Sequence, residues 1–406
     1  MSYTLDELRF LRDTMPDIQE RCADLQLSGG SLVSDVAELR AVYGDYGRAA
    51  AELVQAQRSG VAAGKFPGDW LVCHDSAQQA TPRVVAEARA RRIVRAMGEG
   101  SIVHDVTCSV GTEGAALLDA GLRTVGSDLD PVRCAMAAWN LRGRGALITR
   151  ADALRPSSRA EVIVADPARR HAGRRITSPR QLIPPLPDVV ETYRGREMAI
   201  KCAPGLDYSF WEGLVSVVSV DGGVKEACLY TPGLGGGARR EAIILRSGFR
   251  DHLDDLLPDE PERDLAGEPG TWIIDPDGAI VRAGLVRHYA VREGLWMLDE
   301  RIAYLTGDHV PAGTSGFRVL ETCPVKKVRQ VLQRRDCGRV EILCRGVDID
   351  PDRLRRSLKL KGSQSLGLVL TRQGRSAVAI VCGPRTWAEE GPSPRPSSGT
   401  TLGRRY

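Results

Sequence analysis

Between Ser101 and Cys202, short apolar runs alternate with helical patterns at close intervals. The runs expected to form strands are 101–106, 123–129, 146–149, 161–165 and 197–202, and the segments expected to form helices are 113–121, 131–141 and 187–193. Strands that alternate with helices in this way pair in parallel, and the helices cover the sheet. The segment is therefore predicted to be an α/β domain, in which the carboxyl ends of the strands meet at one edge.

The predicted sheet ends differently from the way it begins. Residues 224–230 and 240–245 have strand patterns, and the Gly-rich segment 232–237 joins them without a helix. Two strands joined directly are expected to pair as an antiparallel hairpin.

The chain of 406 residues is long enough for about two or three domains. We expect an N-terminal helical region over 1–80 and the α/β domain over 81–250, whose first helix Thr81 is expected to cap. An acidic, Pro-rich linker and bridging element is expected over 251–315, a small α+β domain over 316–385, and a disordered tail over 386–406.

Two absences in the sequence narrow the class of protein. No apolar run approaches the roughly 20 residues that a membrane span needs, and residues 1–12 lack the apolar core of a signal peptide, so a cytoplasmic protein is expected. The ten cysteines include no CxxC pair, so we expect reduced thiols and no metal site.

Four aspartates follow four successive predicted strands, namely Asp105, Asp128, Asp152 and Asp166. They should line one crevice at the edge of the sheet. This is the order that an S-adenosylmethionine site requires. The first aspartate suits the ammonium group of the cofactor, and the second suits the ribose hydroxyls. The third suits the adenine amino group, and the fourth lies at the reacting centre. Asp130, before Pro131, is predicted to cap a helix instead.

The stretch 71–245 resembles the class I S-adenosylmethionine-dependent methyltransferases, whose parallel sheet ends in an antiparallel hairpin, and among them the cap-guanine-N2 and related RNA methyltransferases. Thr81-Pro82 matches the Thr-Pro before their first motif. Residues 105–111 match their D-x-x-C-G-x-G motif, except that Ser109 replaces a glycine. A closer resemblance is to an uncharacterised bacterial group with a C-terminal THUMP-like domain, matched by D-P-A-R-R at 166–170, R-A-G at 282–284 and L-K-G at 360–362.

The motifs and the resemblance together imply S-adenosyl-L-methionine as the cofactor. The residues expected to bind it are Thr81, Asp105, Thr107, Cys108, Gly111, Asp128, Asp152 and Asp166.

The residues expected at the reacting centre are Asp166, Pro167 and Arg169. Amino-methyltransferases carry an acid, two prolines and an aromatic residue here, whereas this chain has Ala168 and then an arginine that can stack on a base or bind phosphate. The acceptor atom is left open, because Cys202 could instead act as a nucleophile whose thiol pKa the adjacent Lys201 lowers. The second cysteine that such enzymes usually carry is missing.

The predicted C-terminal domain is strongly basic. Residues 316–385 contain 16 Lys and Arg against 6 Asp and Glu, which favours a polyanionic partner over a merely solvated surface. THUMP domains are associated with RNA binding, so the resemblance implies structured RNA. The residues expected to contact it are Lys326, Lys327, Arg329, Arg334, Arg335, Arg355, Arg356, Lys359 and Lys361.

The sequence thus favours a methyltransferase that modifies a base in structured RNA such as tRNA or rRNA. The two alternatives are a small-molecule methyltransferase and a non-catalytic RNA-binding protein with a relic cofactor fold. The oligomeric state is left open.

Overall fold

The computed structural model describes residues 3–168, 178–257, 266–374 and 376–388, and the backbone of 170–171 and 174–175. The chain divides into two compact units. The first comprises segments 1–215 and 226–237, and the second comprises segments 216–225 and 238–406.

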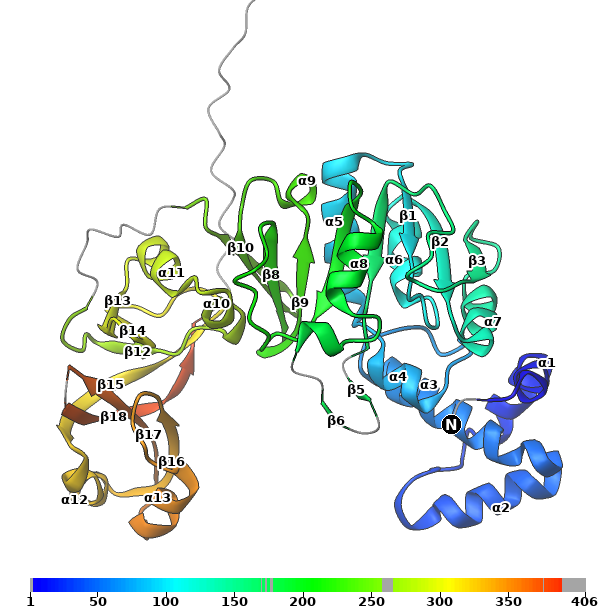
Figure 1. Ribbon diagram of the computed structural model, residues 1–406. Helices are drawn as coiled ribbons and strands as arrows, with labels where there is room; N and C mark the ends of the chain where they lie inside the picture. The colour runs from blue at the N-terminus through cyan, green and yellow to red at the C-terminus, as the bar shows by residue number, and fades with distance from the viewer. Residues whose placement is uncertain are drawn as a thin grey trace, which may run out of the picture. The chain divides into compact units, whose positions relative to one another are not determined.

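A nine-stranded sheet carries the predicted α/β domain (Figure 1). Its strand order is β11-β10-β8-β9-β7-β4-β1-β2-β3. The five strands at one end, from β7 to β3, pair in parallel as predicted. They are β1 (Ile102–Asp105), β2 (Arg123–Asp128), β3 (Leu147–Arg150), β4 (Val162–Ala165) and β7 (Glu197–Cys202).

The two strands predicted to form the antiparallel hairpin do not pair with each other. The two expected strands exist as β9 (Gly223–Tyr230) and β10 (Arg240–Arg246), but β8 (Leu214–Val220) lies between them. β8 is the neighbour of β9 in the sheet order and is joined to it by two residues. β10 pairs with β11 (Phe249–Asp254), which extends into the segment expected to be a linker. β8 was not predicted, although its sequence is a continuous apolar run that is buried on both faces, including Ser216 and Ser219, as expected for a strand inside a covered sheet.

Helices α6 (Thr112–Asp119), α7 (Pro131–Asn140) and α8 (Leu186–Thr192) lie where the sequence predicts them, and α9 (Pro232–Gly235) is a single turn. The predicted cap at Asp130 is confirmed, since its side chain accepts from the Val132 amide at 2.8 Å. The predicted cap at Thr81 is wrong. Helix α5 (Arg83–Met97) has Pro82 at its N-cap, and the Thr81 hydroxyl has another partner in the sheet.

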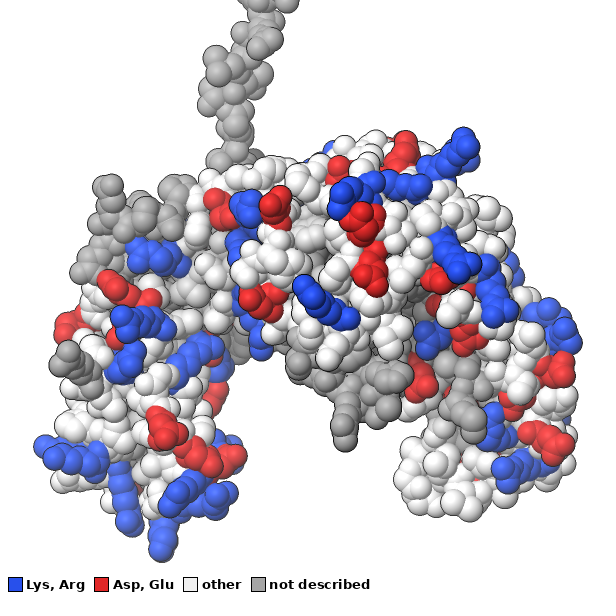
Figure 2. All heavy atoms as spheres, viewed as in Figure 1, with Lys and Arg blue, Asp and Glu red and all other residues white. Residues whose placement is uncertain are grey.

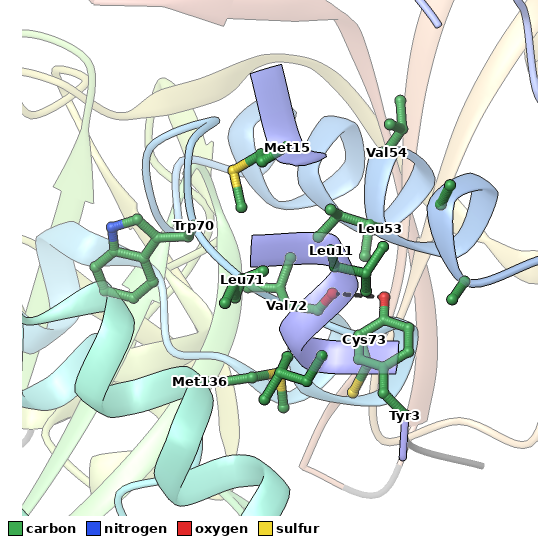
Figure 3. Packing of buried hydrophobic residues seen from close by; sticks show 14 of the residues in the cluster. Tyr3, Leu11, Met15, Leu53, Val54, Trp70, Leu71, Val72, Cys73 and Met136 are labelled. Atoms are coloured by element: carbon green, nitrogen blue, oxygen red, sulfur yellow. Dashed lines mark hydrogen bonds between the residues drawn. The ribbon is translucent and has the colours of Figure 1, made fainter. Parts of the chain in front are cut away.

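The N-terminal region is helical, with α1 (Leu5–Arg21), α2 (Leu32–Tyr43), α3 (Gly47–Ala62) and α4 (His74–Gln79). Figure 3 shows its apolar core, in which Leu11 and Met15 of α1 meet Leu53 of α3. The same core includes Met136 of α7, and the Tyr3 hydroxyl donates to the Val72 carbonyl at 2.9 Å. These contacts attach the helical region to the α/β domain.

The second unit contains a seven-stranded sheet of order β13-β14-β12-β15-β18-β17-β16. Its strands are β12 (Trp272–Ile274), β13 (Trp296–Asp299), β14 (Ile302–Gly307), β15 (Ser315–Pro324), β16 (Cys337–Cys344), β17 (Gln364–Gln373) and β18 (Ser376–Trp387), and its helices are α10 (Gly278–Ala283), α11 (Val286–Glu293), α12 (Val328–Arg334) and α13 (Pro351–Leu358). Because β12 pairs with β15, the expected bridging element belongs to the same sheet as the C-terminal domain. Among the helices of the described residues, none has the length and apolarity required to cross a membrane.

The remaining short elements are β5 (Arg170–His171) and β6 (Arg174–Arg175), which pair with each other, and the 3-10 turns Gly29–Ser31, Gly44–Tyr46, Pro179–Gln181 and Val325–Lys327.

Candidate functional site

The register of the parallel strands brings the four predicted aspartates to one edge of the sheet. Asp105 is the last residue of β1 and pairs with Gly126 and Val164, while Asp128 is the last residue of β2. Asp166 directly follows β4, and Asp152 lies two residues beyond β3. All four therefore lie at the carboxyl ends of adjacent parallel strands, where open α/β sheets bind ligands.

Thr107 joins the ends of β1 and β4. Its hydroxyl lies 3.4 Å from Asp105 Oδ1 and accepts from the Asp166 backbone amide at 2.7 Å, and its own amide donates to Asp105 at 3.1 Å. Asp105 is buried, and burial together with the nearby Glu113 carboxylate raises the pKa of Asp105 to about 7. A carboxyl group of this kind gains a counter-charge when a cation binds beside it.

Asp128 holds the loop that follows β1. Its Oδ2 accepts from the Ser109 amide at 3.1 Å, and its Oδ1 accepts from the Asp130 amide at 3.0 Å. Ser109 has a φ of 48° and Gly111 a φ of 90°, both in the left-handed region. Glycine adopts this region without a steric cost, so Ser109 stands in a conformation that favours glycine.

Cys108 packs against β2 instead of facing solvent. Its side chain is buried, its amide donates to the Ser127 carbonyl at 2.8 Å, and burial raises the pKa of its thiol. A Cβ atom added to Gly126 would lie 3.0 Å from the Cys108 Cβ and 2.7 Å from Ile148 Cδ1. Gly126, which was not predicted as a site residue, allows the loop that follows β1 to lie close to β2.

The far end of the edge is open to solvent. Asp152 is exposed, and its Oδ1 accepts from the Leu154 amide at 2.9 Å. Leu129, between the strand-end Asp128 and the helix cap Asp130, is 65% exposed and leaves an apolar side chain at this edge.

Lys201 provides the main contact that the sequence analysis missed. Its Nζ donates to Asp166 Oδ2 at 2.7 Å and to the Thr81 hydroxyl, and its side chain is only 6% exposed. The alternative in which Lys201 lowers the pKa of the Cys202 thiol gains no support from this contact, because neighbouring residues of a strand point to opposite faces of the sheet. Cys202 itself is fully buried.

A buried ion cluster lies beside this contact. Arg89 of α5 donates to Glu113 of α6 and to Glu226 of β9, at 2.6 Å in both cases, and all three side chains are buried. Glu113 Oε2 is buried without a hydrogen-bond partner among the described residues.

The backbone after the fourth strand is held in place by a short bridge. The Ala168 amide donates to the Ile183 carbonyl at 2.7 Å, and the Ile183 amide donates back at 3.3 Å. Pro167, directly before this bridge, is buried, while Arg169 lies outside the described residues.

Comparisons with known proteins place this geometry in a family. An uncharacterized S-adenosylmethionine-dependent methyltransferase of Mycobacterium tuberculosis, found in strains CDC 1551 and H37Rv, is 49% identical over 329 residues, which cover 78% of this chain and 89% of that relative. The chain belongs to the S-adenosylmethionine-dependent methyltransferases. The predicted activity class and cofactor are thereby confirmed.

Two further similarities cover the architecture of this methyltransferase. Residues 314–384 match the THUMP domain-like family, which confirms the predicted C-terminal resemblance. A crystal structure from Porphyromonas gingivalis W83, provisionally described as a methyltransferase, has the same fold, with a TM-score of 0.70 at 17% identity over 94% of this chain and 99% of that chain.

The residues at the sheet edge of the methyltransferase fit S-adenosylmethionine. The buried Asp105 and the unpartnered Glu113 Oε2 suit a cationic ligand, and Asp128 offers a carboxylate beside the loop. The amino end of α6, opened by Gly111, suits a carboxylate group.

A cavity of about 350 Å³ lies elsewhere in the first unit, along α6. It is lined by Phe66, Trp70, Arg144 and Asp119, among others. Arg144 already pairs with Asp119 at 2.5 Å, and none of the four strand-end aspartates lines the cavity. We therefore do not assign the cofactor to it.

The predicted RNA-binding residues gather around the two helices of the THUMP-like domain, and Figure 2 shows basic side chains at the end of the unit that carries α12 and α13. Three of the nine are paired with acids: Arg334 and Arg335 with Glu321, and Arg355 with Asp352. The other six form no ion pair within the described part of the chain, namely Lys326, Lys327, Arg329, Arg356, Lys359 and Lys361.

The L-K-G motif holds one of these lysines in a tight turn. A Cβ atom on Gly362 would lie 2.0 Å from the Asp336 carbonyl oxygen, and one on Gly338 would lie 1.8 Å from the Gly362 oxygen. The two glycines let the chain segments touch, which fixes the backbone beside Lys361. Arg339, a further basic residue of this domain, lies in β16.

Proposed function

We propose that this methyltransferase methylates a base in structured RNA, such as tRNA or rRNA. Asp166 and Pro167 would orient the acceptor, and the THUMP-like domain would bind the RNA. The observation that carries the proposal is the Asp166 carboxylate, which is bonded to Lys201 and whose backbone is bonded to Thr107, at the same sheet edge as the cofactor residues.

The proposed cofactor contacts follow the order of the strands. Asp105 with Thr107 would receive the ammonium group, the loop of Cys108 and Gly111 the carboxylate group, and Asp128 the ribose hydroxyls. Asp152 would accept a hydrogen bond from the adenine amino group. Thr81 would act indirectly, through the hydrogen bond that its hydroxyl accepts from Lys201.

At the reacting centre, the main task of the protein is to place an acceptor lone pair opposite the methyl–sulfur bond. Bound S-adenosylmethionine supplies a methyl group on a sulfonium sulfur, which keeps the bonding electron pair when the methyl leaves. An ionised Asp166 can only accept hydrogen bonds, so it suits an N–H of the acceptor. As the new C–N bond forms, the proton of that N–H would pass to the Asp166 carboxylate and from there to water. Arg169 would stack on the base or bind an adjacent phosphate.

Nitrogen is a better acceptor than carbon in this site. Carbon methylation through a cysteine adduct requires an accessible thiolate. Cys202 is fully buried, and the adjacent Lys201 is bonded to Asp166 instead.

The domain that would bind RNA supports an RNA acceptor. Six basic residues of one region lack acidic partners among the described residues, which leaves their charge available to phosphates. A small-molecule methyltransferase, the alternative, has no use for such a surface in its reaction.

The test is transfer of labelled methyl groups to total RNA from a strain that lacks this protein, followed by mass spectrometry of the nucleosides. We expect one methylated nucleoside that is absent from the deletion strain, and loss of transfer with Asp166→Ala. If the protein binds S-adenosylmethionine in a calorimeter but labels no RNA, the RNA proposal is wrong and a small-molecule acceptor is favoured.

A further inference from the structure

Lys201 occupies an unusual place for a charged residue. It lies near the end of β7, beside β4, and its side chain is buried in the first unit. Burying an ammonium group costs several kcal/mol unless it is paired and hydrogen-bonded. Its bonds to Asp166 Oδ2 and to the Thr81 hydroxyl meet that requirement.

We propose that Lys201 is a positioning residue, which keeps the Asp166 carboxylate ionised and in one orientation so that it accepts a hydrogen bond from the acceptor. The inference rests on the proposed function, because it assigns Lys201 a role in that same methyl transfer. It also restricts the acceptor to groups that can donate a hydrogen bond.

The other two acids near Lys201 have a different cation as their direct partner. Glu113 of α6 and Glu226 of β9 already pair with Arg89 at 2.6 Å. The carboxylate that Lys201 contacts is Asp166, at 2.7 Å. Lys201 is therefore the direct cationic partner of Asp166, and removing it alone leaves that carboxylate without its counter-charge.

Lys201 is set to keep its proton. Burial acts to lower its pKa, but the attraction of Asp166, Glu226 and Glu113 outweighs burial and the repulsion of Arg89, so the pKa of Lys201 is raised. Asp105, at the end of β1, is the other titratable group that senses both Lys201 and Asp166. The cation at Asp166 is therefore present throughout the neutral pH range.

The test compares the full-length wild-type protein with its variants Lys201→Met and Lys201→Arg. The rate of single-turnover methyl transfer to RNA from the deletion strain is measured between about pH 6 and pH 9. Without its bonded cation, Asp166 is protonated more easily. We expect Lys201→Met to be at least about tenfold slower at pH 7 and to recover as the pH rises, because the acid limb of the rate profile moves to higher pH. Lys201→Arg keeps the charge and should keep the position of that limb.

Three controls separate positioning from folding. Lys225→Met, at an exposed lysine of β9, should match the wild-type protein. S-adenosylmethionine affinity is compared at about pH 9, because Lys201 also lowers the pKa of Asp105, and there Lys201→Met should stay within about threefold of wild type. Should Lys201→Met fail to fold, Lys201→Gln is measured in its place, because it removes the charge but retains a hydrogen-bonding side chain.

The outcomes are distinct. If the wild-type protein labels RNA but the neutral variants keep the wild-type acid limb, the positioning role is overturned and the proposed function stands. If the wild-type protein binds the cofactor and labels no RNA, the proposed function fails and takes this inference with it.

Discussion

The Asp128 carboxylate anchors the loop of Ser109, whose backbone amide donates to Asp128 Oδ2 at 3.1 Å while its φ of 48° keeps it in the left-handed region. One bond thus holds a strained residue at the cofactor loop. The strain is small enough for serine, but it limits which residues can stand there.

A β-branched residue at this position should disturb the loop. We expect Ser109→Val to lower the free energy of unfolding by about 1–2 kcal/mol and to weaken S-adenosylmethionine binding, whereas Ser109→Gly should bind at least as tightly as wild type. Urea denaturation and calorimetry measure the two effects. Ser209→Val, at an exposed serine without a positive φ, is the control. Equal affinities for the Val and Gly variants would show that the loop conformation does not matter.

The pKa of Asp105, about 7, makes cofactor binding depend on pH. An ammonium group beside Asp105 favours the ionised form, so binding should release protons below about pH 7. Affinity should therefore rise between about pH 6 and pH 8 and then level off. Calorimetry in two buffers with different ionisation enthalpies measures the released protons. Asp105→Asn should bind weakly at every pH, without this dependence.

The same group affects the stability of the unliganded protein in the opposite direction. The folded-state pKa lies above the unfolded value, so the folded protein holds the extra proton between about pH 4 and pH 7. The contribution of Asp105 to the free energy of unfolding should therefore fall as the pH rises through this window. An unchanged pH dependence in Asp105→Asn would contradict the assignment.

The buried cluster of Arg89, Glu113 and Glu226 should be intolerant of partial removal. We expect Arg89→Met to lower the free energy of unfolding by about 3–5 kcal/mol, because two buried carboxylates lose their counter-charge. The exposed Arg91 on the same helix gives the matched control, and Arg91→Met should change stability by less than about 0.5 kcal/mol. Adding Glu113→Gln and Glu226→Gln to Arg89→Met should restore most of the loss in urea denaturation. A loss below about 1 kcal/mol in the single variant would contradict this account.

The basic residues of the THUMP-like domain should determine the salt dependence of RNA binding. We expect Lys326→Glu, Lys327→Glu and Arg356→Glu each to weaken binding and to reduce the slope of log affinity against log salt by about 1 for each phosphate that the protein no longer neutralises. Arg301→Glu, in a turn of the same unit, is the control. Filter binding at several salt concentrations gives the slopes. Unchanged slopes in all three variants would place the RNA-binding surface elsewhere.

Local patterns were enough to predict the strands that hold the site. The runs that became β1, β2, β4 and β7 are apolar and bounded by turns, so their carboxyl ends could be located with the aspartates that follow them. β8 (Leu214–Val220) is an apolar run of the same kind, buried on both faces like β4, and it was not among the strands predicted from the sequence.

The contacts between distant residues had no signal in one sequence. Lys201 bonds to Asp166, 35 positions away, and to Thr81, 120 positions away. Arg89 and Glu226 are 137 positions apart. Which cation meets which carboxylate depends on the strand order and on the register between β4 and β7, and neither is encoded in local periodicity.

The hydroxyl of Thr107 links two residues that are proposed to have different roles. It bonds on one side to the Asp105 carboxylate and on the other to the peptide nitrogen of Asp166, so a single oxygen atom joins the residue proposed for the ammonium group to the residue proposed to orient the acceptor. Replacing Thr107 with valine would cut both links in one step. Kinetic defects of such a variant would consequently show up in cofactor and acceptor parameters alike, and Thr107 cannot serve as a probe for either one separately.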